Sequence, residues 1–145
     1  MSQKLLPTPY ADVNEVLHHF LERIREAAED RLVGMYLIGS LALGDFDPQS
    51  SDIDFIVVTN PALDASAFNA LKQMHADFAA GGSPWAQRIE AVYVDVGALN
   101  RTDDRMLEET KYPQLEQGTE LFWDVLEKGW VFQHYTLREK GGIVF

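Results

Sequence analysis

The 145-residue sequence contains no cysteine, and this absence removes several classes of site at once. Disulfide bonds, thiolate zinc sites and cysteine nucleophiles are all excluded. A reducing compartment is therefore permitted, although nothing else in the sequence sets the redox environment.

Long apolar segments are also missing. No run of about 18 apolar residues is present, so we expect no helix that spans a membrane. The N-terminal residues Met1–Pro7 lack the apolar core of a secretory signal. We therefore expect one soluble domain in the cytoplasm, with a single compact core.

Positive charge is scarce. The chain has 12 Lys and Arg against 23 Asp and Glu, which gives a net charge of −11. Such a surface repels a polyanion, so long nucleic acid is not an expected partner. A small nucleotide stays compatible because bound Mg²⁺ neutralises phosphates locally, and a cationic co-substrate would be attracted. Solubility alone explains the charge equally well.

The hydrophobic periodicity predicts an α/β chain in which short strands alternate with amphipathic helices. Asp12 is the expected N-cap of the first helix because Glu15 follows it at the spacing of a capping box. We expect helices over about residues 12–24 and 68–78, and strands over Leu32–Ile38, Phe55–Thr59 and Arg88–Val96.

The second half of the sequence has weaker patterns. Asn100–Gln117 carries charges and Tyr112-Pro113, which predicts a loop with one short helical turn. Helix-favouring residues dominate over Leu121–Lys140. The chain ends on the apolar tail Gly142–Phe145, which either packs as a last strand or marks a fragment of something longer.

Two short segments carry the chemistry, namely Gly39-Ser40 and Ser51–Asp54. On a strand, Asp52 and Asp54 face the same side with Cα atoms roughly 6.5 Å apart, so they can share metal. Two divalent ions about 3.5 to 4 Å apart, bridged by such carboxylates, would polarise the attacked phosphoryl group and stabilise the leaving oxygen in a two-metal mechanism. Gly39 lets the backbone approach a phosphate, and Ser40 can donate from its hydroxyl and its N–H. Ser51 offers one more donor.

Other uses of an Asp-x-Asp pair fit less well. In haloacid dehalogenase-type phosphatases and many sugar-nucleotide transferases the pair ends an apolar strand, whereas here it begins one. A calcium loop starting at Asp45 fails because Ser50 and Ile56 stand where glycine and glutamate are needed. The structural alternative is a strand cap at Asp52, a solvated Asp54 and an ordinary turn. The joint occurrence of all these features favours function.

These segments resemble the nucleotidyltransferase superfamily with the DNA polymerase β-type fold. The resemblance implies its minimal α/β (α+β) fold, with a mixed central β-sheet and flanking helices. The signature consists of Gly39-Ser40, Ala42, Gly44 and Ser51–Asp54. Within the superfamily the sequence is most similar to streptomycin/spectinomycin-type aminoglycoside adenylyltransferases. That similarity rests on Tyr36–Ser40, Ser51–Val58 and Arg88–Val94, and continues weakly through Tyr112-Pro113 and Gly118–Leu121.

The resemblance implies transfer of AMP from ATP to a hydroxyl of a small molecule, such as an aminoglycoside. It places Mg²⁺ on Asp52 and Asp54, and nucleotide contacts at Gly39, Ser40 and Ser51. Glu90 is implied as the third carboxylate and as the general base that deprotonates the acceptor hydroxyl. The alternative for Glu90 is a surface charge on an edge strand. Asp95 competes for the role but faces the other way.

The resembling enzymes continue into a helical C-terminal domain that supplies nucleotide contacts and much of the acceptor pocket. We therefore expect a catalytic domain over residues 1–100 and a helical extension over residues 101–145 that leads to a domain absent from this chain. The acceptor stays open. A second hypothesis is a catalytically silent or regulatory module that binds a helical partner, as an antitoxin does. A homodimer is also open.

Histidine and tryptophan are set aside as site residues. None of the four histidines has metal-ligand spacing to another, which indicates surface or packing roles. The three tryptophans can stack on a base, but their apolar surroundings are more typical of a core or an interface.

Overall fold

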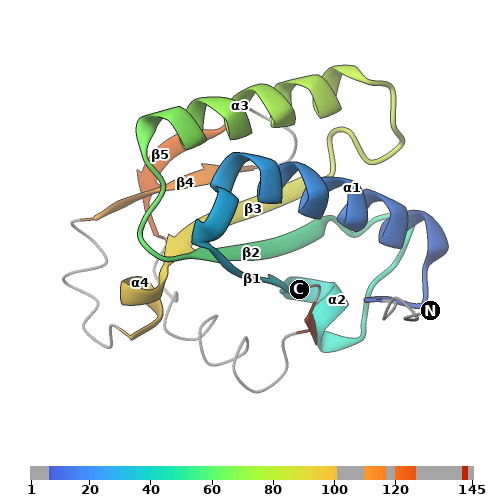
Figure 1. The fold of residues 1–145 in the computed structure, drawn as a ribbon. Coiled ribbons are helices and arrows are strands. Elements are labelled where there is room, and N and C mark those ends of the chain that lie inside the picture. The colour runs from blue at the N-terminus through green and yellow to red at the C-terminus, as the bar shows by residue number, and fades with distance from the viewer. Residues whose placement is uncertain (1–6, 101–109, 117–119, 127–141, 144–145) are drawn as a thin grey trace, which may run out of the picture.

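A computed structural model describes residues 7–100, 110–116, 120–126 and 142–143 of the chain. Within these residues six strands form one sheet in the order β5-β4-β3-β2-β1-β6 (Figure 1). Strands β2 and β3 are parallel, and the other neighbouring pairs are antiparallel. The strands are β1 Leu32–Leu37, β2 Ile53–Thr59, β3 Ile89–Asp95, β4 Lys111–Leu115, β5 Phe122–Val125 and β6 Gly142–Ile143. The expected mixed sheet with flanking helices is confirmed.

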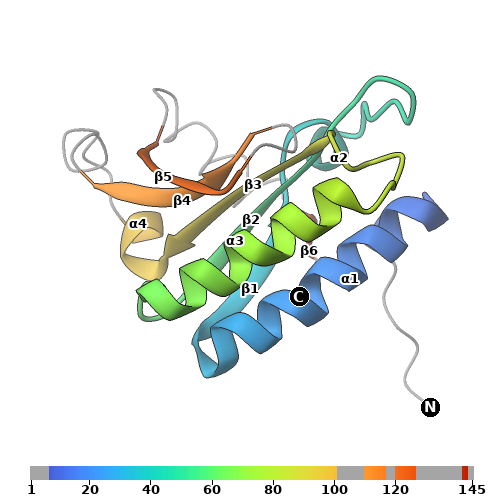
Figure 2. The ribbon, with the colours of Figure 1, turned by 90° about the horizontal axis from the view of Figure 1, so that it is seen from above.

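Two long helices, α1 (Ala11–Ala28) and α3 (Ala65–Ala80), lie side by side over one face of this sheet (Figure 2). Odd-numbered strand residues point toward them, and Met35, Phe55 and Tyr93 belong to the core between the layers. Burial of this apolar surface is the main favourable contribution to folding. The helices α1 and α3 thus cover one face of the sheet and do not cover the opposite face.

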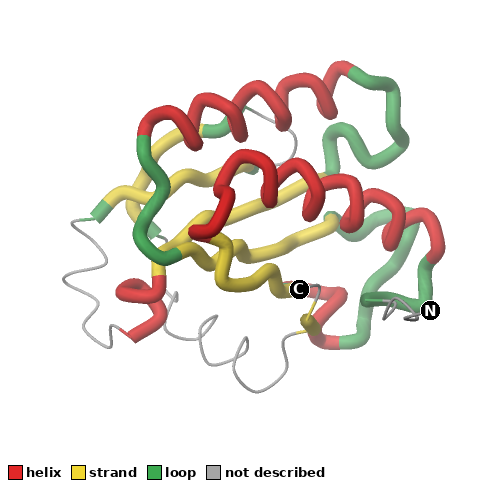
Figure 3. Tube along the Cα trace, in the orientation of Figure 1, coloured by secondary structure: helices red, strands yellow, loops and turns green. Residues whose placement is uncertain are grey.

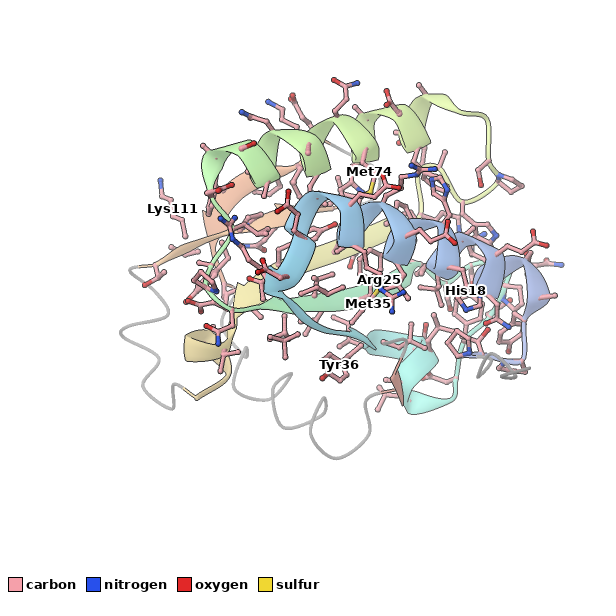
Figure 4. All side chains as sticks on the ribbon, in the orientation of Figure 1. His18, Arg25, Met35, Tyr36, Met74 and Lys111 are labelled. Atoms are coloured by element: carbon pink, nitrogen blue, oxygen red, sulfur yellow. The ribbon has the colours of Figure 1, made fainter. Side chains whose placement is uncertain are left out.

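Even-numbered strand residues lie on the second face. Ile56, Val58 and Val94 form a smaller apolar cluster there, and Tyr36 packs against it on the side away from α1 and α3 (Figure 4). The short helices α2 (Gly39–Leu43) and α4 (Val96–Asn100) adjoin the ends of β1 and β3 (Figure 3). A 3-10 turn, η1, covers Glu29–Arg31 between α1 and β1.

The expectations for the second half are corrected at two places. The loop expected over Asn100–Gln117 contains strand β4, and the helix expected from Leu121 is replaced by strand β5 over Phe122–Val125. Strand β3 pairs only with Gln114 and Leu115 of β4. Pro113, which lacks an N–H, lies before this pairing and is therefore tolerated in the strand. Aromatic and β-branched residues favour β5. The rest of the helix expectation lies outside the described residues.

The apolar tail packs as a strand over its described part. Gly142 pairs with Leu37 and Ile143 with Tyr36, so β6 forms an edge of the sheet. This confirms one of the two readings of the tail for these residues. The division of the chain at residue 100 stays a prediction. Among the helices that the structure describes, none has the length and apolar character that a membrane crossing requires.

Candidate functional site

Three carboxylates meet on the face opposite α1 and α3. The parallel register of β2 and β3 pairs Asp54 with Glu90, and Asp52 precedes Asp54 by one strand repeat. One oxygen from each residue lies within 4.8 Å of the others. The structure therefore brings together the three acids that the sequence pattern singles out.

Asp54 lies in an environment that disfavours its own charge. Burial, followed by the neighbouring Glu90 and Asp52 carboxylates, raises the pKa of Asp54 to about 8. Its Oδ1 is buried and has no hydrogen-bond partner among the described residues. This environment favours the protonated form of Asp54, and a cation bound here would compete with that proton.

The three acids fit a divalent cation. Carboxylate oxygens are the ligands that Mg²⁺ prefers, and the buried Asp54 oxygen offers an unused lone pair. All three side chains are partly buried, so solvent screens their mutual repulsion only in part. A cation held by Asp52 and Asp54, with Glu90 beside it, would relieve this repulsion.

Gly39 lies directly against the Asp54 carboxylate. Its φ of +63° falls in the left-handed region that favours glycine. A Cβ at this position would overlap Asp54 Oδ2, and the neighbouring Ile38 N–H donates to the Asp54 carbonyl at 3.0 Å. Glycine is thus required here by the backbone and by the carboxylate. Its contact with nucleotide stays a prediction.

Ser40 and Ser51 occupy turns beside the acids. The Ser40 carbonyl accepts the Gly44 and Asp45 amides at 3.0 and 3.1 Å at the end of α2. Ser51 Oγ accepts the Asp47 N–H at 2.9 Å, and the Ser51 N–H donates to the Asp47 carbonyl at 2.8 Å. Ser51 therefore closes the loop that leads into Asp52. The nucleotide contacts of both serines stay predictions.

Asp47 and Asp95 have structural partners. Asp47 Oδ1 accepts the Gln49 N–H at 2.9 Å, and this bond shapes a turn and lowers the pKa of Asp47. Asp95 Oδ1 accepts the Ala98 N–H at 2.9 Å and caps α4. Asp95 lies at the end of β3 remote from Glu90, so it is not a member of the acidic cluster.

Arg88 is a neighbour of the site that the sequence pattern did not single out. Its guanidinium donates to the Ser51 carbonyl and lies 4.2 Å from the centre of the Trp85 ring. The available signal was strand alternation, since Arg88 stands two residues before Glu90.

A separate cavity lies beside α1 and α3. It has a volume of about 610 Å³ and is lined by α1 and α3 residues that include His19, Met74 and Phe78. These helices cover the face opposite the carboxylates, so this cavity is separate from the acidic site (Figure 2).

Two solved structures are similar to this chain. One is a crystal structure of a toxin–antitoxin with AMP-PNP, at 22% identity, with 84% of each chain covered and a TM-score of 0.36. The other is a mutant of the toxin–antitoxin MntA-HpeT, at 21% identity, with 84% of each chain covered and a TM-score of 0.35. Neither likeness is strong enough to bear on this chain.

No curated protein matches the chain significantly. The chain does match a sequence-family profile. The profile of the nucleotidyltransferase domain matches residues 20–117, which span Gly39, the three carboxylates and β4. Because this match covers more than half of the sequence, the chain belongs to the nucleotidyltransferase domain family.

Proposed function

We propose that this protein transfers AMP from ATP to a hydroxyl of a small molecule in a Mg²⁺-dependent reaction. The observation that carries the proposal is the cluster of Asp52, Asp54 and Glu90 within 4.8 Å. The orphaned, buried Asp54 oxygen supports a cation at this place. Family membership supports nucleotidyl transfer as the reaction class.

In the proposed reaction each carboxylate has a distinct task. Asp52 and Asp54 would hold the divalent ions of a two-metal mechanism, which when bound would neutralise charge on the nucleotide phosphates. Glu90 takes the proton from the acceptor hydroxyl while the oxygen of that hydroxyl forms a bond to the α-phosphorus. The bond from this phosphorus to the bridging oxygen breaks, and pyrophosphate leaves. Gly39, Ser40 and Ser51 are the proposed nucleotide contacts.

The acceptor that we propose is a cationic, aminoglycoside-like molecule. The net charge of −11 would attract such a molecule and would repel long nucleic acid. A bound divalent ion offsets the same field for ATP. We place the reaction in the cytoplasm, where ATP is available.

The test is transfer of label from α-³²P-ATP to a panel of cationic and neutral hydroxyl acceptors in the presence of Mg²⁺. The wild-type chain should label at least one acceptor, and Asp54→Asn and Glu90→Gln should not. Asp95→Asn is the matched control, because asparagine also caps a helix and Asp95 lies outside the acidic cluster. This control should retain transfer.

Three results would contradict the proposal. Transfer that survives Asp54→Asn would remove the metal role of that residue, and label transferred from γ-³²P-ATP instead of α-³²P-ATP would show a kinase. A chain that binds no nucleotide with Mg²⁺, and instead forms a stable complex with a helical partner, would favour the regulatory hypothesis.

A further inference from the structure

Asp52 stands just outside the regular part of the sheet. Strand β2 begins at Ile53, so Asp52 follows the loop that Ser51 closes. Its carboxylate must nevertheless reach the oxygens of Asp54 and Glu90. Something other than the ladder of β2 has to fix the backbone at this position.

Arg88 holds the peptide groups on both sides of Asp52. Its guanidinium Nη2 donates to the carbonyl of Ser51, which belongs to the preceding peptide. Its main-chain carbonyl accepts the N–H of Ile53, which belongs to the following peptide, at 2.8 Å. One residue of the turn into β3 therefore sets the orientation of both peptide planes that flank Asp52.

The guanidinium is itself held in place. It lies over the Trp85 ring at 4.2 Å, and the Arg88 N–H donates to the Trp85 carbonyl at 2.9 Å. Trp85 is buried, and its ring stacks on Phe46 with a centroid distance of 5.9 Å. The cation–π contact and this aromatic support restrict the rotamers of Arg88.

Asp12 completes this support. It is not the N-cap expected from the sequence, because α1 begins at Ala11 after Tyr10. The side chain of Asp12 instead accepts the Trp85 Nε1 hydrogen at 3.2 Å. The start of α1 is thereby connected through Trp85 and Arg88 to the backbone of Asp52.

We propose that Arg88 is a positioning residue that fixes Asp52 relative to Asp54 and Glu90 and so sets the affinity of the site for a divalent cation. This inference rests on the proposed function of the same site. Metal ligands depend on outer groups that orient them, and loss of such a group typically weakens metal binding by about 10- to 100-fold. Lysine lacks the planar fork that can donate and stack at once.

The experiment is a Mn²⁺ titration of the full chain, followed by electron paramagnetic resonance. Arg88→Met should weaken Mn²⁺ binding by about 10- to 100-fold, and Arg88→Lys by less. Arg23→Met is the matched control, since Arg23 pairs with Glu26 on the exposed side of α1 and should bind Mn²⁺ like the wild type. Arg88→Lys decides the question if Arg88→Met does not fold.

A double-mutant comparison separates positioning from a general structural effect. If Arg88 acts through Asp52, Arg88→Met should cause no further loss of Mn²⁺ affinity in a chain that already carries Asp52→Asn. Losses that simply add would overturn the inference. Equal affinities of Arg88→Met and the wild type would overturn it too and leave the proposed function intact. A wild-type chain that binds no Mn²⁺ would overturn both.

Discussion

Asp54, which is partly buried, and His75, which is buried, are associated with opposite faces of the same sheet. Each leaves one atom, Asp54 Oδ1 or His75 Nδ1, without a hydrogen-bond partner among the described residues. His75 extends from α3 toward β3, on the helix-covered face, where its Nε2 lies 2.6 Å from the Tyr93 hydroxyl. The two positions differ in how the surrounding structure treats charge.

Around His75 both partners are kept neutral. Burial lowers the pKa of His75 to about 4 and raises the pKa of Tyr93 well above its ordinary value. The ring of Phe20 lies 5.3 Å from the His75 ring and adds apolar packing. A neutral pair of this kind satisfies a core without attracting an ion.

Around Asp54 the structure instead concentrates charge of one sign. Glu90 and Asp52 are the charged neighbours that act on its pKa, and both raise it. Repulsion between these carboxylates contributes no stability to the fold. The arrangement therefore points to a ligand that brings positive charge. The comparison teaches that an unsatisfied buried atom indicates a site when its neighbours repel its charge, and indicates packing when they neutralise it.

The largest expected effect comes from Asp54→Asn. We expect transfer to fall by about 10³-fold, equivalent to about 4 kcal/mol, because the variant loses a charge that would hold the cation. Initial rates at saturating ATP, with Asp95→Asn as the control, measure this effect. A loss of less than about tenfold would place Asp54 with His75 as a packing residue.

The same substitution should increase the stability of the metal-free chain at high pH, although it lowers the rate of transfer. The pKa of Asp54 is about 8 in the folded chain against 3.8 for an ordinary aspartate, so the folded state binds more protons between these values. Without metal, wild-type stability therefore falls as pH rises toward 8. In EDTA at about pH 9, Asp54→Asn should melt at a higher temperature than the wild type. A lower melting temperature would contradict a repulsive site.

The second largest effect is the pH dependence conferred by His75. Its pKa is about 4 in the folded state and 6.5 when unfolded, so the unfolded state binds more protons between these values. The stabilisation is therefore complete above about pH 6.5 and is lost as pH falls toward 4, by about 3 kcal/mol. Urea unfolding across this range measures it.

His75→Gln is the variant that isolates this contribution, because glutamine can bond to Tyr93 but does not titrate. Its unfolding free energy should fall less steeply over the same pH range. The exposed His19, replaced by Gln, is the matched control and should keep the wild-type slope. Identical slopes in all three chains would show that His75 is protonated freely in the fold.

These two positions also show what the sequence can and cannot predict. The period of two in a strand placed Asp52 and Asp54 on one face, because that rule is local, whereas Glu90 was implied by the resemblance and joins them through the parallel register of β2 and β3. The partner of His75 was not predictable, since Tyr93 is 18 residues away and meets it only when α3 packs over β3. The His75 pair is a tertiary contact, and so is the pairing of Glu90 with Asp54; only the placement of Asp52 beside Asp54 follows from alternation.

The same distinction explains the strands and the arginine that the sequence did not predict. Strands β4 and β5 have little periodicity of their own and are stabilised by antiparallel neighbours. The contact from Arg88 to the Ser51 carbonyl spans 37 residues and depends on the parallel pairing of β2 and β3. Local rules do not determine such contacts.

The third effect concerns Gly39, where an added methyl group would contact the Asp54 carboxylate. Gly39→Ala should destabilise the chain by about 2 kcal/mol, because it combines a positive φ with a contact against Asp54 Oδ2. Gly44→Ala is the matched control, since Gly44 has a φ of +82° but open space around it. It should cost about 1 kcal/mol. Equal losses of stability in the two variants would mean that the Asp54 side chain moves away from the added methyl group without an energetic penalty.

The smallest effect tests the neutral side of the comparison. Tyr93→Phe removes the hydroxyl that lies 2.6 Å from His75 Nε2 and leaves a buried nitrogen without this partner. We expect a loss of about 1 kcal/mol in unfolding free energy, measured at about pH 7.5, where His75 is neutral in both states. The same variant should leave Mn²⁺ affinity unchanged, because Tyr93 faces α3 and the acids face the other way.

Tyr36→Phe is the matched control on the acidic face. Tyr36 is partly buried, and its replacement should change stability by less than about 0.5 kcal/mol. If Tyr93→Phe cost no more than this control, the His75–Tyr93 hydrogen bond would contribute nothing to the core. The two faces would then differ only in their charges. If Tyr93→Phe also weakened Mn²⁺ binding, the sheet would transmit changes from one face to the other, and the two buried positions could not be treated as independent.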